Sequence, residues 1–357
     1  MQNLYLILEN GRVFAGKSFG YAGEVTGELV FTTAMVGYLE TLTDPSYYGQ
    51  ILLQTFPLIG NYGVIPADFE SKKPQLKAYI VREWCQEPSN FRSEGRLDTF
   101  LMDNKIVGLC GIDTRALTKV IRQHGVMNAK ITPNPEVTPE LLAEIKAYKA
   151  EDAVQNVTCA EVTVTGEGRK VVLWDFGTKQ SVADALQQRG CQVIKMPASS
   201  TAEEILAAKP EGILLSMGPG NPADNTAIVA ELTKLLAAGI PTFGIGLGHQ
   251  LLAMAHGAQV TKLHYGHRGG HPVQDTATGE VYTSSQNHGY VVQADTLPET
   301  AKITFVNAND ATCEGIDYTD KPAFSVQFYP EAVGGAENST FLFDKFVAMM
   351  SAAKEEK

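Results

Sequence analysis

The sequence has few cysteines, and nothing in their spacing indicates pairing. The five are Cys85, Cys110, Cys159, Cys191 and Cys313, an odd number with no Cys-x-x-Cys pair among them. Disulfide frameworks and zinc ribbons need cysteines at short, regular spacings. We therefore expect reduced, mostly buried thiols in a cytoplasmic protein.

Long apolar runs and an excess of basic residues are also lacking. The first apolar run, residues 4–8, has no basic residue before it and stops at Glu9, which indicates a strand and not a signal peptide. No run is long enough to span a bilayer. Lys and Arg total 29 against 40 Asp and Glu, a net charge of −11. Because such a surface repels phosphates and anionic lipids, we expect neither nucleic acid nor membrane as a partner.

The chain is long enough for two domains, since it has 357 residues of which 44% are hydrophobic. Its N-terminal part is strand-rich: two short apolar stretches flank Asn10-Gly11, a strong hairpin signal. A further strand is expected at residues 28–33 and a helix at 113–121, with Asp113 as its N-cap. A second helix is expected at residues 136–150.

Beyond Arg169 strands and helices alternate. Strands are expected at residues 170–175, 191–196, 212–216 and 241–245, and helices at 181–188, 201–208, 223–238 and 248–255. This alternation predicts an α/β fold with a mostly parallel sheet flanked by helices. Strands and hairpins follow from residue 259, and a helix covers about 339–353. The predicted organisation is a strand-rich α/β domain at 1–150, a linker at 151–169 and the parallel-sheet domain at 170–357.

The segment from Pro241 onward has the pattern of a nucleophile elbow. A short apolar strand runs directly into Gly244-Ile245-Gly246-Leu247-Gly248-His249-Gln250 and then into an apolar helix. Such a turn lifts one side chain above the sheet edge and directs backbone N–H groups of the helix N-terminus at the same point. Taken alone, the segment fits a glycine-rich turn without chemistry equally well.

Three other segments add to this pattern. The loop Ser216-Met217-Gly218-Pro219-Gly220-Asn221-Pro222 follows a parallel strand, so it opens at the same sheet edge. Gln286-Asn287-His288-Gly289-Tyr290 predicts a polar turn with an aromatic residue. The strand at residues 325–328 leads into Tyr329-Pro330-Glu331.

In this order, the four segments resemble those of class I glutamine amidotransferases. The N-terminal half narrows the resemblance to the small subunit of carbamoyl phosphate synthetase, and with residues 266–272 it covers nearly the whole chain. The N-terminal motifs that carry it are Phe31-Thr32-Thr33-Ala34-Met35-Val36-Gly37-Tyr38, Leu42-Thr43-Asp44-Pro45-Ser46-Tyr47, Gly60-Asn61-Tyr62-Gly63, Ser89-Asn90-Phe91-Arg92 and Gly111-Ile112-Asp113-Thr114-Arg115.

The resemblance implies a glutamine-hydrolysing subunit with a larger partner. In that family a cysteine thiolate forms a thioester with glutamine, and a histidine oriented by a glutamate moves the protons. Ammonia then passes through a tunnel to a large subunit, which makes carbamoyl phosphate from bicarbonate and ATP. The resemblance implies no cofactor or metal in this subunit, since ATP and magnesium would belong to the large one. Arginine and pyrimidine synthesis both remain open as the pathway.

The resemblance also assigns roles by position. Glu331 corresponds to the orienting acid, and backbone N–H groups near Leu247 and Gly220 would stabilise the oxyanion. The positions assigned to glutamine binding are Ser46, Gly218, Gly220, Leu247, Gln250, Asn287, Gly289 and Tyr290.

Two catalytic side chains of the family pattern are missing. Gly246 stands at the nucleophile position, and Tyr329 stands where the histidine is expected. Loss of such a nucleophile costs on the order of 10⁶ in rate, and a phenol is a poor base at neutral pH. Glycine keeps the elbow turn without strain, and we expect it to leave space beside Leu247. Smaller departures are Met217, Asn221 and a missing asparagine before His271.

Three functions follow from this pattern. The favoured one is a non-hydrolysing small subunit that still binds its large subunit. The alternative is a non-catalytic glutamine-binding or regulatory module, and the least favoured is a glutaminase with relocated chemistry. We interpret His249 as a packing or capping residue. No metal site is expected at His264, His267 and His271, because the stretch is predicted to be a glycine-rich loop and no cysteine or carboxylate is expected close by.

Overall fold

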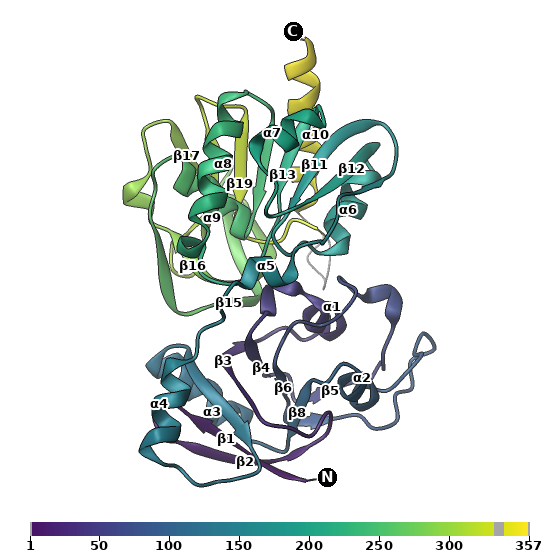
Figure 1. Ribbon diagram of the computed structural model, residues 1–357, viewed down its shortest axis with the longest axis vertical. Coiled ribbons are helices and arrows are strands. Elements are labelled where there is room, and N and C mark those ends of the chain that lie inside the picture. The colour runs from purple at the N-terminus through teal and green to yellow at the C-terminus, as the bar shows by residue number, and fades with distance from the viewer. Residues whose placement is uncertain (1, 332–338, 356–357) are drawn as a thin grey trace. The chain divides into compact units, whose positions relative to one another are not determined.

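The computed structural model describes residues 2–331 and 339–355. Its contacts divide the chain into two compact units, Met1–Ala153 and Val154–Lys357 (Figure 1). Each unit has a sheet and a hydrophobic core of its own.

A closed barrel forms the N-terminal unit. In barrel order its strands are β1 (Asn3–Leu8), β2 (Val13–Ser18), β8 (Val107–Cys110), β6 (Ala78–Ile80), β4 (Gln50–Gln54), β3 (Val25–Thr32) and β9 (Met127–Thr132). The predicted hairpin is confirmed, since β1 pairs antiparallel with β2 and Leu6 lies opposite Phe14. The strand expected at residues 28–33 is the larger part of β3, which runs parallel to β4.

Along the chain, helices and two short strands alternate with the barrel strands or follow them. They are α1 (Tyr38–Thr43), α2 (Leu97–Asp103), α3 (Thr114–His124), α4 (Pro139–Ala147) and the parallel pair β5 (Leu58–Ile59) and β7 (Glu83–Trp84). Asp113 caps α3 as expected, because its carboxylate accepts from the Ala116 N–H at 2.9 Å. The helix expected at residues 136–150 is shorter: Thr138 caps it and Tyr148 leaves the helical conformation.

A mixed sheet forms the C-terminal unit. Its strands in order are β10 (Thr163–Thr165), β12 (Cys191–Pro197), β11 (Arg169–Asp175), β13 (Gly212–Leu215), β14 (Thr242–Ile245), β19 (Ala323–Val326), β18 (Cys313–Tyr318), β17 (Ala301–Asn307), β15 (Val260–Asp275) and β16 (Val281–Val292). From β12 to β19 the neighbours are parallel, which confirms the predicted α/β class. From β19 to β16 they are antiparallel.

Helices cover both faces of this sheet, as Figure 1 shows. α7 (Ala202–Ala207), α8 (Thr226–Ala237) and α9 (Leu247–Ala255) contribute to one buried cluster, which includes Leu232 and Leu251. α6 (Gln180–Gln187) and α10 (Phe341–Glu355) contribute to the other, which includes Leu186 and Phe346. In the described ranges 2–331 and 339–355, no helix is both long and apolar enough to cross a bilayer.

Three segments differ from the sequence-based expectation. Residues 151–169 include a short helix, α5 (Ala153–Val157), and the edge strand β10. Residues 266–272, expected as a glycine-rich loop, lie in β15, and residues 286–290, expected as a turn, lie in β16. The two strands form a long hairpin with a register shift between Lys262 and His267, where Gly266 has φ 71°. The glycines of this segment therefore belong to an irregular antiparallel ladder between β15 and β16, and not to a loop.

Candidate functional site

The elbow lies where β14 ends and α9 begins. Gly246 has φ 58° and ψ −111°, a backbone conformation that side-chain-bearing residues rarely adopt. Its N–H donates to the Val326 carbonyl at 2.9 Å, and its carbonyl accepts from the Gln250 N–H at 3.2 Å. Leu247 is the first helical residue, so its N–H stands at the positive end of α9. The predicted strand–turn–helix geometry is therefore present at Gly246.

The surroundings of the elbow are more crowded than expected. A Cβ atom on Gly246 would lie 3.0 Å from Met217 Cβ and 3.8 Å from Tyr329 Cε1. Met217 and Tyr329 are both buried. The space predicted beside Leu247 is thus limited by two side chains, one from the loop after β13 and one from the chain after β19.

The loop after β13 approaches the backbone of the neighbouring strand very closely. The Ser216 hydroxyl accepts from the Phe176 N–H at 2.8 Å and donates to the Met217 carbonyl at 2.8 Å. A Cβ atom on Gly218 would come within 2.2 Å of the Phe176 carbonyl oxygen, and Gly220 has φ 89°. Both glycines are therefore required by the backbone path of this loop.

The remaining predicted positions of the C-terminal unit lie on α9 and β16. Gln250 donates through Nε2 to the Tyr290 carbonyl at 2.8 Å and to Gln327 Oε1 at 2.9 Å, which ties α9 to β16. Asn287 lies opposite Arg268 in the β15–β16 ladder, and a Cβ on Gly289 would be 3.6 Å from Arg268 Nη2.

Ser46 belongs to the N-terminal unit. It lies in a short 3₁₀ turn, Pro45–Tyr47, where its N–H donates to the Asp44 carboxylate at 2.8 Å. Its hydroxyl oxygen is buried and makes no hydrogen bond among the described residues.

Lys179 is a site residue that the sequence analysis missed. Its ammonium lies 2.8 Å from Glu331 Oε1, with side-chain exposures of 5% and 2%, so the ion pair is buried. The same nitrogen is 4.7 Å from the centroid of the Tyr329 ring. Glu331 is thus neutralised by an ammonium that also contacts the aromatic ring.

A tight turn positions Lys179. After β11, the Asp175 carboxylate accepts from the N–H groups of Gly177 and Thr178 at 3.0 and 2.7 Å. The sequence signal was available: Asp175-Phe176-Gly177-Thr178-Lys179 follows a parallel strand and opens at the same sheet edge as the elbow. Its pairing with Glu331 was hidden because the two residues are 152 positions apart.

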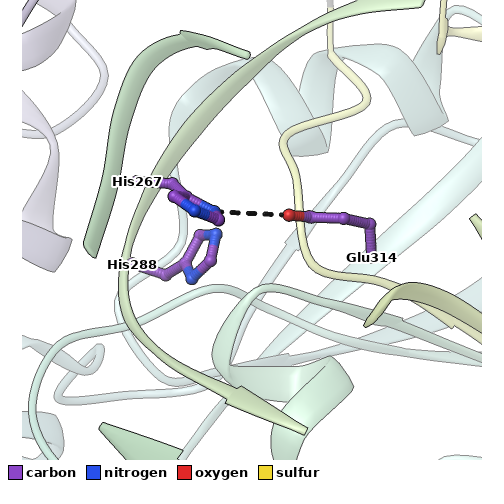
Figure 2. A group of neighbouring side chains, drawn as sticks. All are labelled: His267, His288 and Glu314. Carbon is purple, nitrogen blue, oxygen red and sulfur yellow. Dashed lines mark ion pairs between the residues drawn. The ribbon is translucent and has the colours of Figure 1, made fainter. Parts of the chain in front are cut away.

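A second polar cluster lies among the antiparallel strands of the same unit. Figure 2 shows His267 of β15, His288 of β16 and Glu314 of β18 close together. His267 Nε2 is 2.8 Å from Asp310 Oδ2, and its Nδ1 is 3.4 Å from Glu314 Oε1. The expectation that no carboxylate lies near this histidine is therefore wrong, since two acids distant in sequence approach it.

Burial and charge shift the titration of this cluster. Burial lowers the pKa of His267, but Glu314 and Asp310 together raise it above its ordinary value. Burial raises the pKa of the Glu314 carboxyl. Burial lowers the pKa of His288 well below its usual range and that of His271 to about 4.

His249 lies on the first turn of α9, and its side chain is buried against β19. It has no exposed area, and its Nδ1 is 2.8 Å from the Ser325 hydroxyl. Burial lowers the pKa of His249 to about 3. These observations agree with the packing role expected for it.

The fold and the elbow define the C-terminal unit as a class I glutamine amidotransferase domain. Residues 172–349 match the family model described as glutamine amidotransferase class-I. Residues 6–131 match the model of the carbamoyl-phosphate synthase small chain, CPSase domain.

Curated relatives cover nearly the full chain. Carbamoyl phosphate synthase small chains from Clostridium perfringens and Syntrophotalea carbinolica are 49% and 46% identical to it, over 96% and 99% of this chain and 98% and 99% of their own. A pyrimidine-specific small chain from Halalkalibacterium halodurans is 47% identical over 98% of this chain and 97% of its own. The chain belongs to the carbamoyl phosphate synthase small chain family.

Proposed function

We propose that this chain is the small subunit of a glutamine-dependent carbamoyl phosphate synthetase and that it binds its large subunit without hydrolysing glutamine. The observation that carries the proposal is the paired replacement at Gly246 and Tyr329, within an elbow whose backbone geometry persists. The holoenzyme would then depend on free ammonia.

The chemistry supports this loss of hydrolysis. Glycine offers no atom that can attack the glutamine amide, so no thioester forms at position 246. The five cysteines are free thiols, but none belongs to the elbow or to the loop after β13. Burial raises the pKa of Cys159 to about 11 and that of Cys313 to about 12, which keeps these thiols protonated and unreactive at neutral pH.

The residues expected to transfer the proton are altered as well. Glu331 is held by Lys179 at 2.8 Å, and the Tyr329 ring lies beside that ammonium. With Tyr329 at the base position, Glu331 has no imidazole there to orient and pairs with Lys179 instead. The two replacements therefore remove the nucleophile and the base as one functional unit.

The family and the composition support a proposed partner and location. The proposed partner is a carbamoyl phosphate synthetase large subunit, which would hold the ATP and magnesium. Free thiols and a net charge of −11 support a cytoplasmic protein that binds neither nucleic acid nor membranes. Arginine and pyrimidine synthesis fit this proposal equally.

The deciding experiment compares nitrogen donors in the reconstituted holoenzyme. The chain is purified with its cognate large subunit, and carbamoyl phosphate formation is measured with saturating ammonium or glutamine. We expect synthesis with ammonium, and glutamate release from glutamine no faster than that of a Gly246→Ala control. Glutamine turnover clearly above that control would overturn the proposal.

Titration calorimetry with glutamine distinguishes this proposal from the alternative, a glutamine-binding regulatory module. The alternative predicts binding heat with glutamine in the absence of any large subunit. Co-purification with a large subunit, without such heat, supports the non-hydrolysing subunit instead.

A further inference from the structure

The cluster formed by His267, His288 and Glu314 brings three metal-binding side chains together inside the C-terminal unit. His267 and His288 lie directly opposite each other in the β15–β16 ladder, and Glu314 lies on β18. One ligand atom from each lies within 4.8 Å of the other two, and all three residues are buried (Figure 2). None of them belongs to the elbow.

The contacts of the His288 ring place its Nε2 against the side-chain oxygen of Gln286. Its Nδ1 is 2.9 Å from the Tyr290 carbonyl, which can only accept, so Nδ1 carries the proton. Its Nε2 is 3.0 Å from Gln286 Oε1, and in a neutral ring this nitrogen bears a lone pair. Two acceptors therefore face each other with no proton between them.

Neighbouring groups fix this orientation of the Gln286 amide. The Ser284 hydroxyl donates its one proton to the His271 carbonyl at 2.9 Å. It must then accept from Gln286 Nε2, which lies 3.1 Å away. The amide oxygen is thereby directed at His288, and rotating the amide would break this arrangement.

His267 lies between two carboxylates. Its Nε2 is 2.8 Å from Asp310 Oδ2, and its Nδ1 faces Glu314 Oε1 at 3.4 Å. The two acids raise the pKa of His267, so a metal ion bound at Nδ1 would replace a ring proton that they stabilise. Asn307 Nδ2 is the donor nearest both atoms, at 3.4 Å from Nδ1 and 3.2 Å from Oε1. Glu314 Oε2 is buried and makes no hydrogen bond among the described residues.

We propose that His267 Nδ1, His288 Nε2 and the Glu314 carboxylate bind a divalent transition-metal ion, with zinc as the best match. Two imidazoles and one carboxylate are a common zinc ligand set, with bonds of about 2.0–2.2 Å. At such bond lengths, tetrahedral ligand atoms lie roughly 3.4 Å apart, the spacing already present between His267 Nδ1 and Glu314 Oε1. Gln286 Oε1 is placed to act as a fourth ligand.

The surrounding contacts match those that orient metal-binding histidines. Such a histidine usually donates its other ring N–H to a carboxylate or a backbone carbonyl. His267 does so to Asp310, and His288 does so to Tyr290. The ion would fasten the β15–β16 hairpin to β18 and have a structural role.

The test uses the full-length chain without a histidine tag. The protein is stripped with chelator, titrated with cobalt(II) at neutral pH, and then competed with zinc. We expect one equivalent of cobalt with the visible absorption of a four-coordinate centre, displaced by one equivalent of zinc. Zinc at about one hundred times its Kd should raise the thermal midpoint by roughly 5–10 °C.

Matched variants distinguish this site from surface binding. Glu314→Gln and His288→Gln should each weaken zinc binding at least ~100-fold, and Asp310→Asn by about 10–100-fold through loss of orientation. His264→Gln, on the same strand but exposed, should leave it unchanged. Asp310 has a side chain 42% exposed, so its variant reports on the site if a core variant fails to fold.

Two outcomes would overturn the proposal. One is the absence of stoichiometric cobalt or zinc, which would mean that protons alone separate the facing acceptors as buried imidazolium groups. The other is binding that survives Glu314→Gln and disappears in His264→Gln, which would mark an exposed histidine as the ligand.

Discussion

Gly246 adopts its backbone conformation without strain and without crowding its neighbours, and a cysteine at this position could do neither. Its φ of 58° and ψ of −111° are free of the strain that a side chain would bring. Its missing Cβ also avoids a 3.0 Å contact with Met217 Cβ. A catalytic elbow tolerates such strain because the chemistry requires it, and a glycine elbow has no strain to tolerate.

Restoring both catalytic side chains should restore glutamine hydrolysis. In Gly246→Cys/Tyr329→His we expect glutamate release well above background, because thiolate, imidazole and Glu331 would again form one unit. Each single variant should stay near background, since loss of either member costs about as much as loss of both. Glutamate release by the holoenzyme is the measurement.

The control for this test is Gly246→Ala/Tyr329→His, which adds the Cβ without the thiol. Activity in that control would show that the nucleophile lies elsewhere. A folded double variant that remains inactive and is not alkylated by a glutamine-analogue inhibitor would show that the pocket no longer binds glutamine.

The buried pair of Lys179 and Glu331 should affect stability strongly. Replacing Lys179 by Met removes the ammonium 2.8 Å from Glu331 Oε1, at a carboxylate only 2% exposed, so the free energy of unfolding should fall by roughly 3–5 kcal/mol. Lys179→Met/Glu331→Gln should recover much of that loss, because no buried charge is then left alone. Urea unfolding of the wild type, the two single variants Lys179→Met and Glu331→Gln, and the double variant measures the coupling, and additive effects would contradict it.

At the scale of secondary structure, His249 makes the packing of α9 on β19 sensitive to acid. Its Nε2 is buried without a hydrogen-bond partner among the described residues, so protonation would place a charge where nothing solvates it. Burial lowers the pKa of His249 from 6.5 to about 3. The unfolded chain therefore binds this proton first, and stability falls as pH drops below about 6.5 towards 3.

Between pH 7 and pH 5 this single group should cost about 2 kcal/mol. Urea midpoints of the wild type and of His249→Gln at the two pH values isolate its contribution. The variant should lose less stability on acidification, whereas His264→Gln, with an exposed ring, should behave as the wild type. Equal pH dependence in all three would contradict the assignment.

Elements with a clear period could be predicted, and contacts between distant residues could not. The alternation beyond Arg169 predicted the parallel strands β11 to β14 and their helices, because each is a strongly patterned local unit. Strands and hairpins were predicted from residue 259, but residues 266–272 were predicted as a loop and residues 286–290 as a turn, because their glycines hid a long ladder with a bulge. Glu331 was predicted as a site residue, but its partner Lys179 was not, because pattern analysis carries no long-range distance.

At the scale of the whole molecule, the two units differ in their histidine content. Of seven histidines, only His124 lies in the N-terminal unit, and the three with lowered pKa lie in the C-terminal one. Each unit also contains one of the two tryptophans, Trp84 and Trp174. Tryptophan fluorescence can therefore follow each unit separately.

We expect acid to separate the unfolding of the two units. Between pH 7 and pH 5, the thermal midpoint reported by Trp174 should fall by several degrees more than that reported by Trp84. The variant Trp84→Phe isolates the Trp174 signal, and subtraction from the wild type gives the other. Midpoints that move together would show that the two units unfold as one.

The glycine elbow also restricts the order in which mutations could give this chain the proposed missing activity. A cysteine at position 246 would meet a strained backbone and the contact with Met217, while Tyr329 would still offer it no proton acceptor. Selection would see only the lost stability, because activity requires both changes. Substitutions at Tyr329 and in the loop after β13 would therefore have to come before a cysteine at position 246, so hydrolysis could not arise by a change at the elbow alone.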